Sequence, residues 1–252
     1  MTKRPRFLAV AHLKGGSGAT TVSVNLAAGL AARRHRVLLI DLDPIGASTF
    51  HLTDAVPALT VADALDGRAE LARVIVPTAL ERLTVAPSSP QLATWDRKPE
   101  RFAVDLNRVL AGVPAGTEFV VIDLPPSAGA LVRGTLAVLP GGEVIAPVQT
   151  RALDMMGFGD LVRLLAELRE QNAALHLAGI VPQRTNKGAL SRDVLEALKH
   201  EHGRRVLPAI RESAAVARAP LRHLPLILAA PHAPALEDFN ALTRAVLNLK
   251  GE

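Results

Sequence analysis

A glycine-rich segment near the start of the chain has the residue types of a phosphate-binding loop. The segment KGGSGATT, residues 14–21, lies between an apolar run and a stretch with helical spacing. Its glycines allow successive backbone N–H groups to converge on phosphate oxygens, and the helix that follows presents its positive end to the same anion. The Thr20 hydroxyl is a natural ligand for a Mg²⁺ ion that bridges the outer phosphates. Taken alone, the segment is also compatible with a strand-to-helix turn that binds nothing.

The segment departs from the common phosphate-loop pattern at one position. The pattern G-x-x-x-x-G-K-S/T requires a lysine before the hydroxyl residue, and Ala19 fills that place. A different lysine, Lys14, precedes the glycines. A lysine directed at the terminal phosphates stabilises the charge that develops in the transition state of nucleotide hydrolysis. Its absence therefore predicts that a bound nucleotide is hydrolysed slowly or not at all.

Two further segments place aspartates at the ends of expected strands. VLLIDLDPIGAS carries Asp41 and Asp43, and EFVVIDLPPSAG carries Asp123. In open α/β sheets ligands bind outside the carboxyl ends of the strands, where these side chains would lie. Strand alternation points Asp41 and Asp43 to opposite sides, so one could hold a metal or the structure while the other orients water. Each aspartate singly is also a common turn former or helix cap.

Alternation of apolar runs with helical segments defines the expected fold. The expected strands are Phe7–Leu13, Val37–Asp41, Leu83–Ala86, Phe119–Leu124, Val144–Val148 and Leu177–Val181. The expected helices are Thr20–Arg33, Phe102–Val113, Leu131–Leu139, Leu153–Gln171 and Ser191–His200. This order predicts an α/β fold with a doubly wound, mostly parallel sheet and helices on both faces. No linker or composition break interrupts it, so we expect a single domain over residues 1–252.

Three local features complete the expected organisation. The prolines and aspartates of HLTDAVPALTVADALDG indicate a loop around a short helix. Four prolines between Pro220 and Pro234 indicate an extended connection before the last helix. Trp95 is expected to pack at the surface.

Composition limits the classes of function. The chain has 29 Lys and Arg against 24 Asp and Glu, a net charge of +5, which suits nucleic acid, nucleotides or an anionic membrane. With 3% aromatic residues, a nucleic-acid partner would be held through charge more than base stacking. The absence of cysteine excludes disulfides and thiolate sites. No apolar run is long enough to cross a bilayer, and we expect a cytoplasmic protein.

The ordered motifs resemble those of the ParA/MinD group of deviant Walker ATPases, and in particular the small, Soj-type ParA partition proteins. KGGSGATT resembles the KGGxGKTT of that family, LLIDLDPIGAS resembles its DxDPQG segment, and VVIDLPPSAG resembles its Walker B segment. The resemblance covers nearly the whole chain. It implies a P-loop NTPase fold, binding of ATP and Mg²⁺, and an ATP-dependent sandwich homodimer that binds DNA without sequence preference. A ParB-type partner would stimulate hydrolysis, and the protein would associate with the nucleoid.

The resemblance also assigns roles to individual residues. Lys14 would reach the nucleotide of the partner protomer, Asp43 would position the attacking water, and these two would be the catalytic residues. The metal would be held by Thr20, Asp41 and Asp123. The expected nucleotide-binding residues are Lys14, Gly15, Gly16, Ser17, Gly18, Ala19, Thr20 and Thr21. The adenine would contact backbone near VLPAIRE.

Departures from the family pattern extend beyond Ala19. Leu13 and Ile45 replace glutamines that are usual in the family, and His12 replaces a frequent asparagine. A single designed substitution would not bring these changes with it, which favours a naturally degenerate loop.

Cations concentrate in the C-terminal part, where ParA dimers present their DNA surface. The ordinary alternative is a solvated helix face. If the cations do contact DNA, binding should be non-specific and fall steeply with salt. The expected DNA-binding residues are Lys187, Arg192, Arg211 and Arg218.

Two other functions remain open at this point. One is a non-hydrolysing DNA-binding scaffold or regulator that keeps the fold without the ATP cycle. The other is a MinD-like regulator at a membrane site. The C-terminal segment PALEDFNALTRAVLNLKGE lacks the basic face and bulky anchors of a membrane-surface helix, so we expect no membrane partner.

Overall fold

The computed structural model of the protein describes residues 4–249, apart from the side chains of residues 152–154. The strands are β1 (Arg6–Val10), β2 (Val37–Asp41), β3 (Val76–Pro77), β4 (Leu83–Ala86), β5 (Phe119–Asp123), β6 (Glu143–Gln149) and β7 (His176–Gln183). The longer helices are α1 (Ala19–Ala32), α5 (Pro99–Ala111), α6 (Ala130–Val138), α7 (Ala152–Leu168), α8 (Ala189–His202) and α11 (Ala235–Asn248). Short helices are α2 (Ala47–Leu52), α3 (Val61–Leu65), α4 (Leu71–Val74), α9 (Ala214–Arg218) and α10 (Leu226–Ala229), with 3₁₀ turns η1 (Pro90–Arg97), η2 (Gly203–Arg205) and η3 (Ala219–Arg222).

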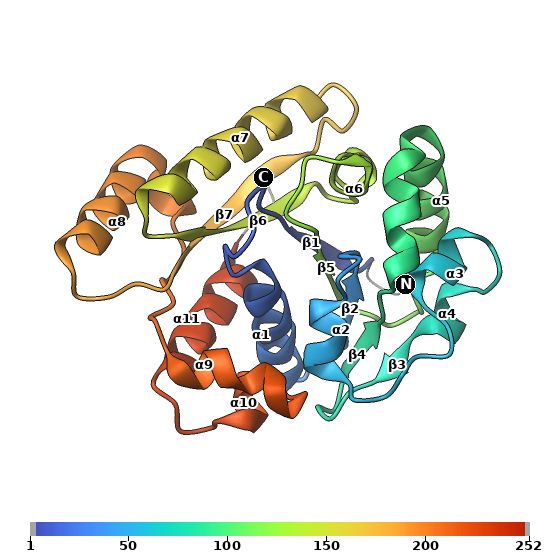
Figure 1. The fold of residues 1–252 in the computed structure, drawn as a ribbon, viewed down its shortest axis with the longest axis horizontal. Helices are drawn as coiled ribbons and strands as arrows, with labels where there is room; N and C mark the ends of the chain where they lie inside the picture. The colour runs from blue at the N-terminus through green and yellow to red at the C-terminus, as the bar shows by residue number, and fades with distance from the viewer. Residues whose placement is uncertain (1–3, 250–252) are drawn as a thin grey trace.

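The seven strands form one sheet in the order β3-β4-β2-β5-β1-β6-β7, at the centre of the molecule (Figure 1). Neighbouring strands are parallel except β3 and β4, which pair antiparallel at one edge. The predicted fold class is therefore confirmed. The expected strands and longer helices are all present with shifted ends, whereas β3, only two residues long, has no counterpart among the predictions.

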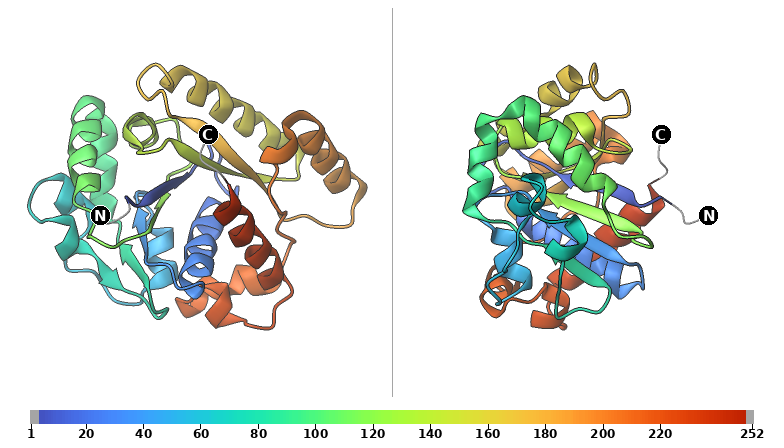
Figure 2. Two further views of the ribbon diagram at one scale, coloured as in Figure 1. Left: turned by 180° about the vertical axis from the view of Figure 1, so that it is seen from behind. Right: turned by 90° about the vertical axis from the view of Figure 1, so that its right-hand side faces the viewer.

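Apolar side chains leave each central strand on both faces, and two hydrophobic cores result. In β1, Phe7 and Ala9 pack into the core under α5, α6 and α7, whereas Leu8 and Val10 pack into the core beside α1 and α11. The view from behind in Figure 2 shows α1 in blue next to α11 in red, on the same side of the sheet. Covering helices on both faces explain why the strands read as continuous apolar runs.

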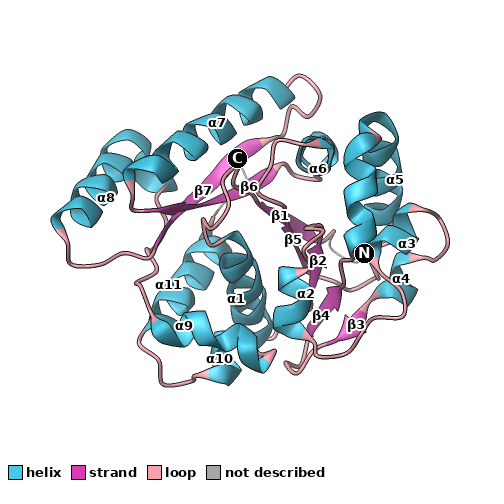
Figure 3. Ribbon diagram, in the orientation of Figure 1, coloured by secondary structure: helices cyan, strands magenta, loops and turns pink. Residues whose placement is uncertain are grey.

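The carboxyl ends of the parallel strands share one edge of the sheet. Asp41 at the end of β2 is in register with Asp123 at the end of β5, and Gln149 at the end of β6 is in register with Gln183 at the end of β7. Figure 3 shows the loops that leave this edge toward α1 and α2. The topology therefore gathers polar residues from four strands around the start of α1.

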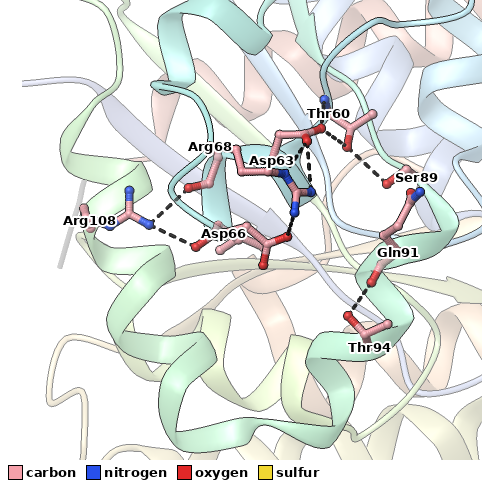
Figure 4. Close-up of polar contacts among 10 residues, drawn as sticks. Thr60, Asp63, Asp66, Arg68, Ser89, Gln91, Thr94 and Arg108 are labelled. Carbon is pink, nitrogen blue, oxygen red and sulfur yellow. Dashed lines mark hydrogen bonds and ion pairs between the residues drawn. The ribbon is translucent and has the colours of Figure 1, made fainter.

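A capping box begins the short helix expected in the irregular region after α2. The Thr60 N–H donates to Asp63 Oδ2 at 2.8 Å, and Arg68 forms ion pairs with Asp63 and Asp66 (Figure 4). Arg108 of α5 donates to the carbonyls at the end of α3, also visible in Figure 4. These bonds satisfy both ends of a helix only five residues long.

Two expectations about local structure are wrong. The segment from Pro220 to Pro234 is not extended, because it contains α10 and part of η3; Pro225 and Pro234 stand at the N-caps of α10 and α11, where a fixed φ favours helix initiation. Trp95 is 1% exposed and packs against Phe102 in the core, because η1 folds it under α5.

Within residues 4–249, none of the helices combines the length and the apolar character needed to cross a membrane.

Candidate phosphate-binding site

The loop between β1 and α1 has the backbone conformation of an anion cradle. Gly16 and Gly18 adopt left-handed conformations, with φ of 82° and 93°, and Gly18 is the N-cap of α1. Gly15 does not share this conformation, so the sharp turns lie at the second and third glycines. Ala19 is the first residue of the helix and Thr20 the second. The loop thus directs the positive end of a 14-residue helix at the space above it.

Side chains from β6 and from the loop itself hold this conformation. Gln149 Nε2 donates a hydrogen bond to the carbonyl of Gly16. The Lys14 N–H donates to Nδ1 of the buried His12 at 2.9 Å. A Cβ on Gly157 of α7 would come within 3.1 Å of His12 and of Lys14, so this helix packs closely on the loop. Ser17 is also buried, at 3% exposure.

Asp123 is the buried acceptor at the centre of the site. Its Oδ1 accepts from Ser23 of α1 at 2.8 Å, and its Oδ2 accepts from Ser48 of α2 at 2.7 Å. Burial raises the pKa of Asp123, whereas hydrogen bonds from Ser48, Ser23 and Thr20 act in the opposite direction. The structure therefore brings together Thr20 and Asp123, which were both predicted to serve the metal.

These oxygens fit Mg²⁺, which in nucleotide sites is bound through few protein ligands together with phosphate oxygens and water. Thr20 offers a hydroxyl and Asp123 a carboxylate from the same small region. A cation there would favour the ionised form of Asp123. Its chemical contribution, when bound, would be to neutralise charge that develops on the outer phosphates.

Asp41 lies against Asp123 but has most of its bonding capacity occupied. Its Oδ2 accepts from the Thr49 N–H at 2.8 Å and from Thr49 Oγ1 at 2.7 Å, and its Oδ1 accepts from the Asp43 N–H at 3.1 Å. Burial raises its pKa, the charge of Asp123 raises it further, and the bonds from Thr49 lower it. In this arrangement Asp41 joins β2 to the start of α2. A place in the metal shell remains a prediction for Asp41.

Thr49→Val is expected to lower the free energy of unfolding by about 2–4 kcal/mol. The variant removes the hydroxyl that donates to the buried carboxyl of Asp41 and accepts from the Ser88 N–H at 2.9 Å. Losing the donor raises the pKa of Asp41 further. Burial already raises this pKa to about 8, so both proteins hold the proton near neutral pH and the deficit should grow as the pH rises from 7 to 9. Denaturant unfolding at both pH values measures the effect.

Thr94→Val is the matched control for that prediction. Thr94 is exposed, and its hydroxyl makes a single bond of 2.8 Å to the Gln91 carbonyl. Its loss should cost less than about 1 kcal/mol at either pH. Equal costs for the two threonines would contradict the structural role assigned to Thr49.

Asp43 lies two residues beyond the end of β2. Its Oδ1 accepts from the Ile45 N–H at 2.9 Å, and the residue is 8% exposed. Its charge acts on Asp123, which it reaches across the strand ends. The neighbouring Ile45 is apolar but 81% exposed. It stands where the ParA/MinD pattern usually has a glutamine. The Leu13 side chain, the other such departure, packs instead against the core.

A cavity of about 490 Å³ opens beside the start of α1. Gly18 and Thr21 form its wall on the loop side, Gln183 and Arg184 belong to β7 and its end, and Ile210, Arg211 and Glu212 come from the VLPAIRE segment. That segment was expected to contact the adenine. Its position beside the loop places this cavity next to the left-handed glycines and the start of α1.

The four cations predicted to contact DNA differ in their surroundings. Arg211 forms a bidentate ion pair with Asp238 of α11, with both N···O distances at 2.7 Å, so its guanidinium is already engaged. Lys187, Arg192 and Arg218 are exposed, and none of them forms an ion pair within the described part of the chain. A β-bridge between Thr185 and Arg211 brings the segment that carries Lys187 and Arg192 beside the segment that carries Arg211 and Arg218.

Several polar residues of the site were not singled out from the sequence. Ser23, Ser48 and Thr49 hold the aspartates, and Gln149 and Gln183 flank the loop. The two glutamines carried a usable signal, since each ends an apolar strand in the position that aspartates occupy elsewhere in this sheet. The hydroxyl residues carried none, because serine and threonine are common near helix starts.

A parallel sheet with this loop between β1 and α1, and with a buried aspartate at the end of β5, defines a protein of the P-loop NTPase fold. The AAA domain family matches residues 5–177 of the chain. The chain is 31% identical to the sporulation initiation inhibitor protein Soj of Bacillus subtilis, over 96% of this chain and 98% of Soj. It is also 31% identical to the chromosome partitioning protein ParA of Caulobacter vibrioides, over 88% of this chain and 86% of that protein.

A solved structure matches the chain over a larger share of its length. Cobyrinic acid a,c-diamide synthase from Mycobacterium smegmatis, with bound ADP and magnesium, is 28% identical with a TM-score of 0.78, over 98% of both chains. The chain belongs to the ParA/MinD family of deviant Walker P-loop ATPases, and Soj-type chromosome partition proteins are among its relatives.

Proposed function

We propose that this chain is a ParA-like partition protein that binds ATP with Mg²⁺ at the loop of residues 14–21. In the ATP state it forms a homodimer and binds DNA without sequence preference, within the cytoplasm and on the nucleoid. A ParB-type partner protein acts on this state. Hydrolysis is slow or absent, because Ala19 leaves the terminal phosphates without the lysine that the family provides.

The proposal rests on two features that lie together at one edge of the sheet: the glycine loop before α1 and the buried carboxylate of Asp123. Gly16 and Gly18 turn the loop toward the positive end of α1, and Thr20 lies beside the buried Asp123. Backbone N–H groups and a helix terminus bind phosphate without any lysine. This supports nucleotide binding in a chain that lacks one of the usual charges.

Roles for the remaining site residues follow from family membership. Lys14 would contact the nucleotide of the other protomer and neutralise developing charge, as an arginine finger does. Asp43, whose charge acts on Asp123, would orient the attacking water. Both roles need the dimer. They would contribute little to turnover while Ala19 stands at the start of α1.

Gly18→Ala is expected to weaken ATP binding at least about thirtyfold. A side chain at a φ of 93° is strained, and its Cβ would lie 3.1 Å from Gln183 Oε1, so the loop must leave its cradle conformation. Calorimetric titration with ATP and Mg²⁺ measures the loss. The proposed function predicts measurable binding by the unaltered chain.

Gly159→Ala in α7 is the control for this substitution. Its Cβ would meet only Arg163 at 4.0 Å, an ordinary contact, and alanine is the better helix former. This variant should bind ATP as the unaltered chain does. If neither the unaltered chain nor the control binds nucleotide, a nucleotide-free scaffold replaces the ATP-binding protein as the proposed function.

A further inference from the structure

A buried glutamine lies against the phosphate loop and lines the adjoining cavity. Gln183 is the last residue of β7 and is 3% exposed. Its side chain lies flat against Gly18, where an added Cβ would be 3.1 Å from Oε1 and 3.4 Å from Cγ. The same residue lines the cavity together with Gly18 and Thr21. Gln183 therefore stands where a nucleotide would pass from the loop into the cavity.

The amide nitrogen of this side chain is buried without a hydrogen-bond partner in the part of the chain that the structure describes. Its neighbour in the sheet provides a contrast, because Gln149 Nε2 donates to the Gly16 carbonyl. A buried donor without an acceptor destabilises a folded protein, and such groups concentrate where a ligand supplies the missing partner. The two glutamines are in register on adjacent strands, but only the amide of Gln149 has an acceptor within the described residues.

We propose that Gln183 Nε2 donates a hydrogen bond to a bound nucleotide, at the junction between the α-phosphate and the ribose of that nucleotide. This inference rests on the proposed nucleotide binding and deepens it. The junction follows from position, since the loop and the start of α1 take the phosphate chain and the cavity takes the nucleoside. The acceptor would be an oxygen, of which that junction carries several.

A neutral amide in this place has a consequence particular to this chain. The lysine that would add charge at the terminal phosphates is absent, so a larger share of affinity must come from uncharged donors. Gln183 would contribute equally to ADP and ATP, because the junction is common to both. Its contact with Gly18 also gives a second reason, besides φ, why only glycine fits at that position.

The test compares Gln183→Leu, a substitution of similar size without the donor, with the unaltered chain. Without nucleotide, the variant should melt about 2–4 °C higher, because the unpartnered amide is gone. Calorimetric titration with Mg²⁺ present should show ADP and ATP both weakened about tenfold, by the same factor. Gln149→Leu is the control; it breaks an existing bond to Gly16 and should lower the melting temperature instead.

Each other result identifies what has failed. Unchanged binding of both nucleotides by Gln183→Leu would overturn the inference while leaving the proposed function intact. Weakened ATP with unchanged ADP would also overturn it, since the contact would then be to the terminal phosphate. If the unaltered chain binds neither nucleotide, the proposed function fails and the inference fails with it.

Discussion

Replacing Ala19 with lysine is expected to raise the rate of ATP hydrolysis by about a hundredfold or more. Ala19 is the first residue of α1 and half-buried, next to the left-handed Gly18 that turns the loop. A lysine at this position can extend toward the terminal phosphates from the loop side. A preorganised positive group directed at charge that develops in the transition state is worth about two to three orders of magnitude in turnover. Phosphate release measured with saturating ATP, Mg²⁺ and DNA tests this directly.

Ala19→Met is the matched control for the lysine variant. Methionine has a similar length and the same helical propensity but no charge. It should leave turnover near that of the unaltered chain. Equal stimulation by lysine and methionine would show that packing limits the reaction, and no gain from lysine would show that other departures, such as Leu13 and Ile45, also inactivate the site.

Removing three exposed cations should weaken DNA binding about a hundredfold near 0.1 M salt. The variant combines Lys187→Ala, Arg192→Ala and Arg218→Ala, which are exposed on the segments around α8 and α9. Each phosphate contact that is lost reduces the slope of log affinity against log salt by about 0.9, so the slope should fall by about 2–3. Arg211 is left out of the set because Asp238 already engages it.

A second triple variant tests whether location or net charge determines this loss. Arg73→Ala, Arg97→Ala and Lys98→Ala remove the same charge from exposed positions around α4 and η1. In Figure 1, α4 lies on the opposite side of the molecule from α8. Fluorescence anisotropy with a short duplex, over a series of salt concentrations, measures both variants. The basic segments near α8 and α9 would lose their assigned role if the two variants gave equal losses.

The sequence predicted those features that depend on local pattern. Continuous apolar runs such as Val37–Asp41 identified the central strands, because a sheet covered on both faces requires them. The loop could be located because glycines and a helix start lie next to each other in the chain. Asp123 could be placed at the edge of the sheet beside this loop because its strand ends there.

Features that depend on pairing between distant segments could not be predicted. The ion pair of Arg211 with Asp238 joins the segment after β7 to α11, and no local pattern indicates it. The burial of Trp95 depends on how η1 folds against α5. The bonds from Thr49 to Asp41 require α2, a six-residue helix too short to show a periodic signal.

A search of the sequence for charged residues also identified only part of the site. Searching for lysines and aspartates identifies Lys14, Asp43 and Asp123 but passes over neutral donors. Gln149 and Gln183 flank the loop from the ends of adjacent strands and could be recognised only when the register was known. A chain without the usual lysine makes such neutral groups more important.

The most direct test of the proposed function is DNA binding by the unaltered chain in three states: without nucleotide, with ADP, and with ATP, each with Mg²⁺. A ParA-like protein stalled before hydrolysis should bind DNA tightly with ATP and at least about tenfold more weakly in the other two states. Chain mass in solution, measured on the same samples, should double with ATP alone. Equal DNA binding in all three states, with a monomer throughout, would contradict a nucleotide-controlled partition protein.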